Sequence, residues 1–324
     1  MSAEPCVSVI IPVRDRREML SSCLRALGAQ TYRDFEVVVV DDGSSDGSGD
    51  EAVGFASDGL PVRVVRTDGV GAVEARRRGV AAARGPILAF TDSDCVPEAT
   101  WLERAVAALT DGVDMVQGRT EPVGPVGLLE RSLWVTREDG LYATCNVLYR
   151  RSAFEQAGGF QDAGTLLGFR PGAFGRGLGM GEDALLGWKI AREGRARFVD
   201  DAVVRHEVVR PPVQELFRRA WMAGGFPALV REIPELRGTL LTRHMFLGTR
   251  RIPMYAFIAA ALLRWRLPAL AALAWWAGAR AREARRLERS PAPLMKGVAV
   301  EMATDVVTGT ALAAASVRAR EPVL

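Results

Sequence analysis

The chain has 324 residues, of which 48% are hydrophobic and 25% charged, a composition typical of a folded globular protein and not of a disordered segment. The formal net charge is only +3, and the first two thirds of the chain contain no basic run interleaved with aromatic residues, so we expect no nucleic-acid partner. Four cysteines stand singly, without the spacing of a zinc site or a disulfide framework, which predicts reduced thiols in the cytoplasm.

The N-terminal half alternates strand-like and helix-like stretches. Residues 7–11 are a β-branched run that predicts a buried strand ended by Pro12; no basic segment precedes it, so we do not expect a signal peptide. Asp15 and Glu18 have capping-box spacing before a helix that reaches about residue 27. Further strands are expected at 35–40, 62–66 and 86–91, with a helix at about 73–84. This alternation predicts an α/β fold with a mostly parallel sheet flanked by helices.

Acidic side chains follow two of the predicted strands. Asp41 and Asp42 end the second strand, and Asp92 and Asp94 follow the fourth at alternate positions, which point the same way along a strand. Ligands of open α/β sheets bind outside the carboxyl ends of the strands, so we expect these acids to share one edge. Two carboxylates at that edge are suitable ligands for Mn²⁺ or Mg²⁺, and such a cation in turn binds a diphosphate.

The triplet Asp92-Ser93-Asp94 alone allows other interpretations, of which a solvated turn is the simplest. In a haloacid-dehalogenase-like phosphatase the triplet follows the first strand, whereas three strand-like runs precede it here. A calcium loop needs further acids and a glycine at fixed offsets. A dinucleotide-binding Rossmann enzyme needs Gly-x-Gly-x-x-Gly after the first strand, and a sugar nucleotidyltransferase needs a glycine-rich basic loop there; residues 13–16 read Val-Arg-Asp-Arg.

Taken in order, the motifs resemble those of the family 2 glycosyltransferases of the GT-A fold, which transfer a sugar from a nucleotide diphosphate with inversion. The resemblance runs from residue 7 to about residue 206. The chain departs from the family pattern at Gly69 and Arg77, where Asn is usual, and at Cys145. The motifs that carry the resemblance are Val-Ile-Ile-Pro-Val at 9–13, Val-Asp-Asp-Gly-Ser at 40–44, Gly71 with Ala75-Arg76 and Gly79, Asp92-Ser93-Asp94, Asn146 with Arg150-Arg151, Phe154 and Gly158-Gly159-Phe160, and Gly181-Glu182-Asp183.

The resemblance implies a donor site made of residues from these motifs. Pro12 and Ser93 belong to motifs that would contact the donor, and Asp41 and Asp42 would hold its base and ribose, as carboxylates that accept hydrogen bonds from ring N–H or hydroxyl groups. A turn in which these acids bind backbone amides is the structural alternative. Arg76 would pair with a phosphate, or be an ordinary exposed helical arginine.

The resemblance also implies a metal site. Asp94 is the first candidate for direct coordination of Mn²⁺ or Mg²⁺, and Asp92 would reach the metal, its water or the donor ribose. His206 ends an alternating run and would complete the site, with a purely structural histidine as the alternative. The metal would neutralise charge on the leaving diphosphate.

Glu182 and Asp183 lie in the expected first turn of a helix, and the resemblance assigns the catalytic base to Asp183. A helix N-terminus attracts acids in any protein and lowers the pKa of a carboxylate, which weakens it as a base. Between residues 158 and 181 the chain contains nine glycines, counting both ends. Such a segment predicts a mobile loop that closes over the donor, or else a disordered insertion.

The chain becomes helical after about residue 213. Apolar runs at 252–263 and 267–279 are each too short to span a bilayer and are separated by Arg264-Trp265-Arg266. Trp265, Trp275, Trp276 and five Arg against two Glu between residues 280 and 289 indicate peripheral membrane contact through 252–289, with packing on the catalytic domain as the alternative. Residues 295–315, which include two acids, suit packing better than spanning.

Three segments follow from these observations: residues 1–118 as the nucleotide-sugar-binding half, 119–212 as the acceptor-binding half and 213–324 as a helical extension. We expect a cytoplasmic, metal-dependent inverting glycosyltransferase, peripheral on the membrane, that uses a UDP-, GDP- or dTDP-sugar and a hydroxyl acceptor. Cell-surface glycan, lipid-linked glycan or secondary-metabolite synthesis would be its setting. A catalytically inactive nucleotide-sugar-binding protein is the non-enzyme alternative.

Overall fold

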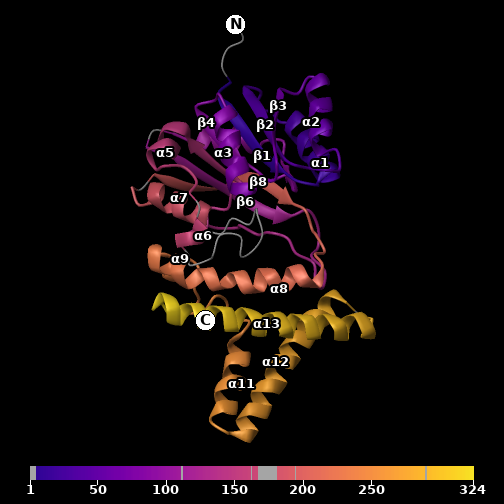
Figure 1. Cartoon of the computed structure of the whole chain (residues 1–324), viewed down its shortest axis with the longest axis vertical. Helices are drawn as coiled ribbons and strands as arrows, with labels where there is room; N and C mark the ends of the chain where they lie inside the picture. The colour runs from indigo at the N-terminus through magenta and orange to yellow at the C-terminus, as the bar shows by residue number, and fades with distance from the viewer. Residues whose placement is uncertain (1–4, 111, 162, 167–180, 194, 289) are drawn as a thin grey trace. The chain divides into compact units, whose positions relative to one another are not determined.

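The computed structural model describes residues 5–110, 112–161, 163–166, 181–193, 195–288 and 290–324. Two compact units divide the chain. The first, the α/β unit, contains residues up to 124 together with 132–207, and the second, the helical unit, contains 125–131 together with 208–324. Figure 1 labels the elements of both units.

One mixed sheet of eight strands forms the centre of the α/β unit, in the order β3-β2-β1-β4-β7-β6-β8-β5. The strands β3, β2, β1 and β4 are mutually parallel, which confirms the four strands predicted from the sequence. β7 then joins β4 and β6 antiparallel, β8 runs parallel to β6, and β5 closes the edge antiparallel to β8. The strands are β1 Val7–Val13, β2 Phe35–Asp42, β3 Val62–Thr67, β4 Ile87–Phe90, β5 Cys95–Pro97, β6 Met115–Pro122, β7 Val147–Arg150 and β8 Ala196–His206.

Helices cover both faces of this sheet, because successive residues of its central strands are apolar on both sides. In β1, Val9 and Ile11 pack in one apolar cluster with α1 and α4, while Ile10 packs in another with α3 and α7. A Cβ on Gly79 of α3 would lie 2.5 Å from Ile10 Cγ2, so this helix packs unusually close to the sheet. The helices are α1 Arg17–Gly28, α2 Ser48–Ser57, α3 Ala72–Ala82, α4 Trp101–Ala108, α5 Arg151–Gln156, α6 Ala163–Leu166 and α7 Glu182–Ala191.

Pro12 does not end the first strand, contrary to the expectation, because β1 continues through Val13 beside β2. The amide of Thr91 donates to the carbonyl of Ile10, so the polar groups of Ile10 face β4. Two residues further on, Pro12 faces the same side, where the pairing of β1 with β4 has already ended. The missing N–H of Pro12 therefore removes no ladder hydrogen bond.

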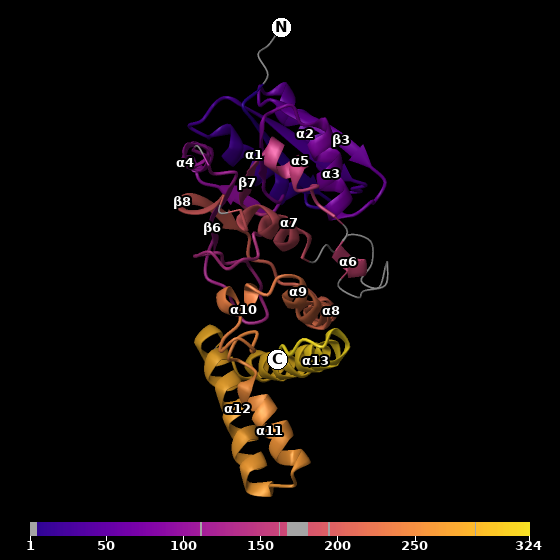
Figure 2. The same cartoon turned by 90° about the vertical axis from the view of Figure 1, so that its left-hand side faces the viewer.

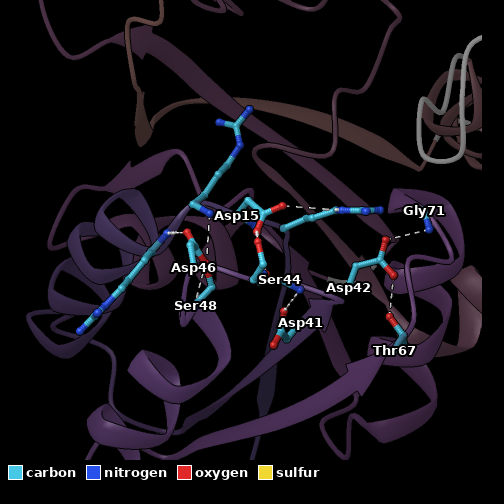
Figure 3. Close-up of polar contacts among 12 residues, drawn as sticks. Asp15, Asp41, Asp42, Ser44, Asp46, Ser48, Thr67 and Gly71 are labelled. Atoms are coloured by element: carbon cyan, nitrogen blue, oxygen red, sulfur yellow. Dashed lines mark hydrogen bonds and ion pairs between the residues drawn. The ribbon is translucent and has the colours of Figure 1, made fainter.

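The predicted capping box at the start of α1 is also wrong. The helix begins at Arg17, and its Arg17 amide donates to Asp46 Oδ2 at 2.9 Å, from the loop after β2. Asp15 instead adopts a positive φ of 51° and accepts a 2.7 Å hydrogen bond from the Ser45 amide. The first turn is thus capped from a neighbouring loop, and the loops that follow β1 and β2 are tied together (Figure 3).

The helical unit confirms the helical pattern expected after residue 213. Its elements are α8 Val213–Met222, a 3₁₀ turn at Ala223–Gly225, α9 Phe226–Glu232, α10 Leu236–Thr239, α11 Ile252–Leu262, α12 Arg266–Leu287 and α13 Pro291–Ala319. Helices α11 and α12 form an antiparallel hairpin, which both views show beside α13 (Figures 1 and 2).

A buried cluster of charges joins the helices of this unit. Arg131 lies 2.9 Å from Glu301 of α13, and Arg250 pairs with both Glu301 and Asp305, the latter at 3.1 Å. Trp276 Nε1 donates to Asp305 at 3.0 Å. Trp276, one of the aromatic residues counted for membrane contact, is only 5% exposed and lies inside this unit.

Candidate active site

A cleft of about 350 Å³ opens at the carboxyl ends of β1, β2 and β4. Parallel neighbouring strands end at the same edge, so the loops that follow them meet there. Twelve residues line the cleft, and six of them were predicted from the sequence to bind the donor or the metal: Pro12, Asp42, Arg76, Asp92, Ser93 and Asp94. The remaining lining residues are Val13, Arg14, Arg16, Gly71, Ala72 and Ala75.

Asp41 and Asp42 point in opposite directions, as successive residues of a strand do (Figure 3). Asp42 lines the cleft and accepts hydrogen bonds from Thr67 Oγ1 at 2.6 Å and from the amides of Val70 and Gly71 at 2.7 and 2.8 Å. Burial acts to raise the pKa of Asp42, but these hydrogen bonds outweigh it and hold the pKa below its usual range. Asp41 lies outside the cleft lining and accepts from the Ser44 amide at 3.0 Å.

Arg76 joins the Asp-x-Asp loop to the start of α7. Its guanidinium lies 2.8 Å from Asp92 Oδ1 and 3.8 Å from Glu182 Oε1, and the residue is only 7% exposed. Burial acts to lower the pKa of Arg76, and the carboxylates of Asp92 and Glu182 outweigh it and raise that pKa. Its Nε–H has no hydrogen-bond partner among the described residues. A buried guanidinium with an unused donor at a cleft wall can accept an anionic ligand.

Asp94 lies between a cation and an imidazole. Arg16 Nη1 pairs with Asp94 Oδ2, and His206 Nε2 lies 3.8 Å from Asp94 Oδ1. The other ring nitrogen of His206, Nδ1, donates to the carbonyl of Glu207 at 2.8 Å. That hydrogen bond fixes the tautomer in which Nε2 carries a free lone pair, the form that a metal ligand requires.

This donor set fits a divalent cation. Ligand atoms of Asp94, Cys95 and His206 lie within 4.8 Å of one another. A hydrogen bond with Cys145, together with burial, raises the pKa of the Cys95 thiol, which disfavours the thiolate that metals bind. What remains is a carboxylate and an imidazole, ligands that suit Mn²⁺ or Mg²⁺, and Asp92 lines the same cleft but is not part of this group.

Glu182 and Asp183 occupy the first turn of α7, as predicted. A helix N-terminus was expected to lower the pKa of Asp183, but the structure indicates a shift in the opposite direction. Burial, and after it the neighbouring charge of Glu182, raise the pKa of Asp183 to about 8. A carboxylate with a pKa near neutral is better matched to accepting a proton than an ordinary one.

Sequence reasoning missed Arg14 and Arg16, which line the cleft from the loop after β1. The available signal was two basic residues directly after a parallel strand, at the same edge as the acids.

Other motif residues hold the fold. Asn146 accepts from Trp101 Nε1 at 2.8 Å and donates to the carbonyls of Arg119 and Ala202, so it ties three strands and a helix together. Arg150 and Arg151 donate to backbone carbonyls of neighbouring loops. The expected mobile loop falls largely on residues 167–180, which lie outside the described residues.

Comparisons with known proteins agree with this geometry. Residues 8–160 match the family model described as Glycosyl transferase family 2. Glycosyltransferase AglE of Haloferax volcanii is 42% identical over 131 residues, which are 39% of this chain and 43% of the relative. The pre-mycofactocin glycosyltransferase of Mycobacterium tuberculosis is 29% identical over 255 residues, which are 72% of this chain and 50% of the relative. The chain thus spans half or less of the length of each of these curated relatives.

A solved structure shares the fold of this chain. The mannosyltransferase PcManGT from Pyrobaculum calidifontis, in complex with GDP-Man and Mn²⁺, superposes with a TM-score of 0.58 at 21% sequence identity. The match covers 95% of this chain and 87% of that one. The predicted GT-A fold, with its α/β sheet and C-terminal helices, is therefore confirmed.

Proposed function

The chain belongs to glycosyl transferase family 2, and from this premise we propose that it is a metal-dependent inverting transferase that moves a sugar from a nucleotide diphosphate to an acceptor hydroxyl. The observation that carries the proposal is the single cleft that gathers Asp42, Arg76, Asp92 and Asp94 at one edge of the sheet. Those residues are separated by up to 52 positions in the sequence, and a ligand bound in the cleft could contact all of them.

The donor would lie along the cleft. Asp42 is fixed by three hydrogen bonds and can accept one more from a ribose hydroxyl or a base N–H. Arg14, Arg16 and Arg76 offer guanidinium groups in the same cleft, and guanidinium groups bind phosphate oxygens with two parallel hydrogen bonds. The proposed donors are UDP-, GDP- or dTDP-sugars.

Asp94 and His206, together with Asp92 of the same triplet, are the residues that would hold Mn²⁺ or Mg²⁺. The bound cation supplies Lewis acidity that stabilises the charge of the leaving diphosphate. The PcManGT complex, which contains Mn²⁺ together with its nucleotide sugar, supports this assignment.

Asp183 is the proposed base. Inversion requires a group that takes the proton of the acceptor hydroxyl as that oxygen attacks the sugar. Asp183 lies in the first turn of α7 beside Glu182, and Arg76, which lines the cleft, contacts both Asp92 and Glu182. Neither Glu182 nor Asp183 is itself among the residues that line the cleft. Four free cysteines fit the reducing cytoplasm, where we place the reaction.

Thermal denaturation with nucleotide sugars tests the proposal. One of the UDP-, GDP- or dTDP-sugars should raise the melting temperature in the presence of Mn²⁺ and not in EDTA, because a ligand at a hundredfold its Kd adds about 2.7 kcal/mol to the free energy of unfolding. Asp94→Ala should abolish the shift. Asp50→Ala, which changes an exposed acid of α2 in the same unit, should retain it.

Two results would contradict this assignment. If no nucleotide sugar shifts the melting curve with Mn²⁺ present, the cleft is not a donor site. If a donor binds but neither transfer nor donor hydrolysis is detected with a panel of hydroxyl acceptors, and Asp183→Asn changes no rate, the chain is a nucleotide-sugar-binding protein without activity.

A further inference from the structure

Exposed apolar side chains gather on the hairpin of α11 and α12. Leu262 is 78% exposed and Leu267 is 80% exposed, on the two sides of the turn that joins the helices. Large apolar residues are normally covered, and a contiguous exposed group of them marks an interaction site. The exposed large apolar residues of the hairpin are Ile258, Leu262, Leu263, Trp265, Leu267, Leu270, Trp275 and, at the far end of α12, Leu287.

The hairpin tip, defined here as residues 258–270, is the part of the helical unit farthest along α11 and α12 from α13. Both views show the two helices running side by side away from α13 to a short turn (Figures 1 and 2). The turn contains Arg264, whose φ of 57° lets the chain reverse between Leu263 and Trp265. Towards α13 the hairpin is packed, and Met254 and Ala284 are almost fully buried.

Up to residue 282 the charged side chains of the hairpin are all arginines, and Glu283 follows near the end of α12. Residues 252–282 contain four arginines and neither Asp nor Glu. Arg264 and Arg266 flank Trp265 at the tip, and neither guanidinium pairs with a carboxylate within the ranges that the structure describes. Apolar residues with a tryptophan and unpaired arginines are the composition of a segment that binds an anionic lipid surface. A protein partner would have to supply all the compensating acids itself.

Helix α13 is another candidate for membrane contact, since it is the one described helix that is long and apolar enough to cross a membrane. Its middle, however, contains Glu301 and Asp305, which are buried and paired with arginines of the helical unit. Insertion of this helix into a bilayer would separate those ion pairs, at a large cost in free energy. The hairpin tip requires no such separation because its apolar groups are already exposed.

We propose that the hairpin tip inserts into one leaflet of an anionic bilayer, with its leucines in the acyl region and Arg264 and Arg266 extended to the lipid phosphates. Segments that bind at the interface enter about 5–10 Å, and long arginine side chains reach back to the headgroups. At 1.5 Å per residue, the eleven residues of α11 are about half the length needed to span the hydrocarbon core. The insertion is therefore monotopic.

Vesicle co-sedimentation of the full chain tests the leucines. Wild type should bind vesicles of phosphatidylcholine mixed with phosphatidylglycerol and bind pure phosphatidylcholine much less. Leu267→Asp should lower the partition coefficient by at least about tenfold, because it places a charge in the acyl region. Val317→Asp is the matched control, since Val317 of α13 is also 80% exposed, and its binding should stay within about twofold of wild type.

Two further variants separate the contributions of charge and depth. Arg264→Gln and Arg266→Gln should each reduce binding to the anionic vesicles about fivefold and hardly change binding to the neutral ones. The tryptophan emission should shift to the blue when anionic vesicles are added, and Trp265→Phe should remove most of that shift. Nucleotide-sugar stabilisation of Leu267→Asp in solution should equal that of wild type, so failure of the donor site and failure of the membrane contact are distinguishable.

The proposal is overturned if wild type does not bind the anionic vesicles, or if Leu267→Asp and Val317→Asp bind equally well. It is also overturned if wild type sediments as a dimer without vesicles and Leu267→Asp sediments as a monomer, since the tip would then bind a second copy of the chain.

Discussion

The cleft of the α/β unit and the charge cluster of the helical unit both contain arginines paired with Asp or Glu, but the two groups serve different purposes. In the cleft, Arg16 and Arg76 each pair with one acid of the Asp-x-Asp triplet on the wall of an open cavity. In the helical unit, Arg250 pairs with Glu301 and Asp305 between packed helices. In an open cleft, an acid can exchange its arginine partner for a cation, and an arginine can exchange its acid for a phosphate. Ion pairs between packed helices separate only when the helical unit unfolds. Position, more than residue type, therefore indicates which cluster is a candidate for chemistry.

The largest expected effect comes from Asp94→Ala. Loss of a metal-binding carboxylate should lower kcat/KM by about a thousandfold, or about 4 kcal/mol of transition-state stabilisation. The free energy of unfolding should change by less than about 1 kcal/mol, because the pair with Arg16 is partly solvated. Transfer assays with Mn²⁺ and urea denaturation measure the two quantities, and a large loss of stability would remove the contrast with the helical unit.

Glu301→Gln should show the opposite behaviour. Removing this carboxylate leaves Arg131 and Arg250 without one of their partners in a buried cluster, and we expect a loss of about 3 kcal/mol of unfolding free energy. Glu283→Gln changes an acid that is 53% exposed and pairs with Arg280, and it should cost less than about 1 kcal/mol. Equal melting temperatures for the two variants would contradict a structural role for the cluster.

The pH dependence of Asp183 gives a more specific effect. Its folded pKa of about 8 exceeds the unfolded value of about 3.9, so between these pH values the folded state retains a proton that the unfolded state has lost. The contribution of this group to stability is complete below about pH 4 and decreases as the pH rises to 8, by at most about 1.4 kcal/mol per pH unit. Asp183→Asn should match wild type near pH 4 and exceed its melting temperature near pH 8.

The same titration predicts that kcat/KM rises with pH up to about 8, since only the ionised carboxylate accepts a proton. A flat profile over this range, in wild type and with saturating Mn²⁺, would argue against Asp183 as the base.

Arg16→Gln should have the smallest effect. Arg16 pairs with Asp94 and would compete with the proposed metal ion for it, so its removal should tighten Mn²⁺ binding about fivefold and weaken donor binding. Calorimetric titration with Mn²⁺ alone measures the first change. Arg17→Gln, at the next position but paired with Glu51 of α2, should leave Mn²⁺ binding unchanged, and a similar response of both variants would exclude direct competition.

The sequence predicted the first half of the sheet well because the strands at 7–13, 35–42, 62–67 and 87–90 are mostly apolar or β-branched and end in acids or turns. It did not predict how β5, β6, β7 and β8 pair, since antiparallel partners far apart in the chain are set by tertiary packing and not by local pattern. The capping of α1 by Asp46 was missed for the same reason, because the capping residue comes from another loop.

The candidate site shows a similar division. Residues at strand ends, such as Asp42 and Asp94, could be placed at one edge from the alternation of elements alone. The direction of the Asp183 pKa shift could not, because the helix N-terminus and burial act in opposite senses and only the folded surroundings of Glu182 and Asp183 decide between them.

The three protein hydrogen bonds to Asp42 limit what that carboxylate can still do. A carboxylate offers about four lone-pair directions, and Thr67, Val70 and Gly71 use three of them. One direction therefore remains, and the group is held ionised with no proton of its own to give. A ligand can therefore bind Asp42 only through a hydrogen-bond donor, and a ligand with an acceptor atom at that point is repelled.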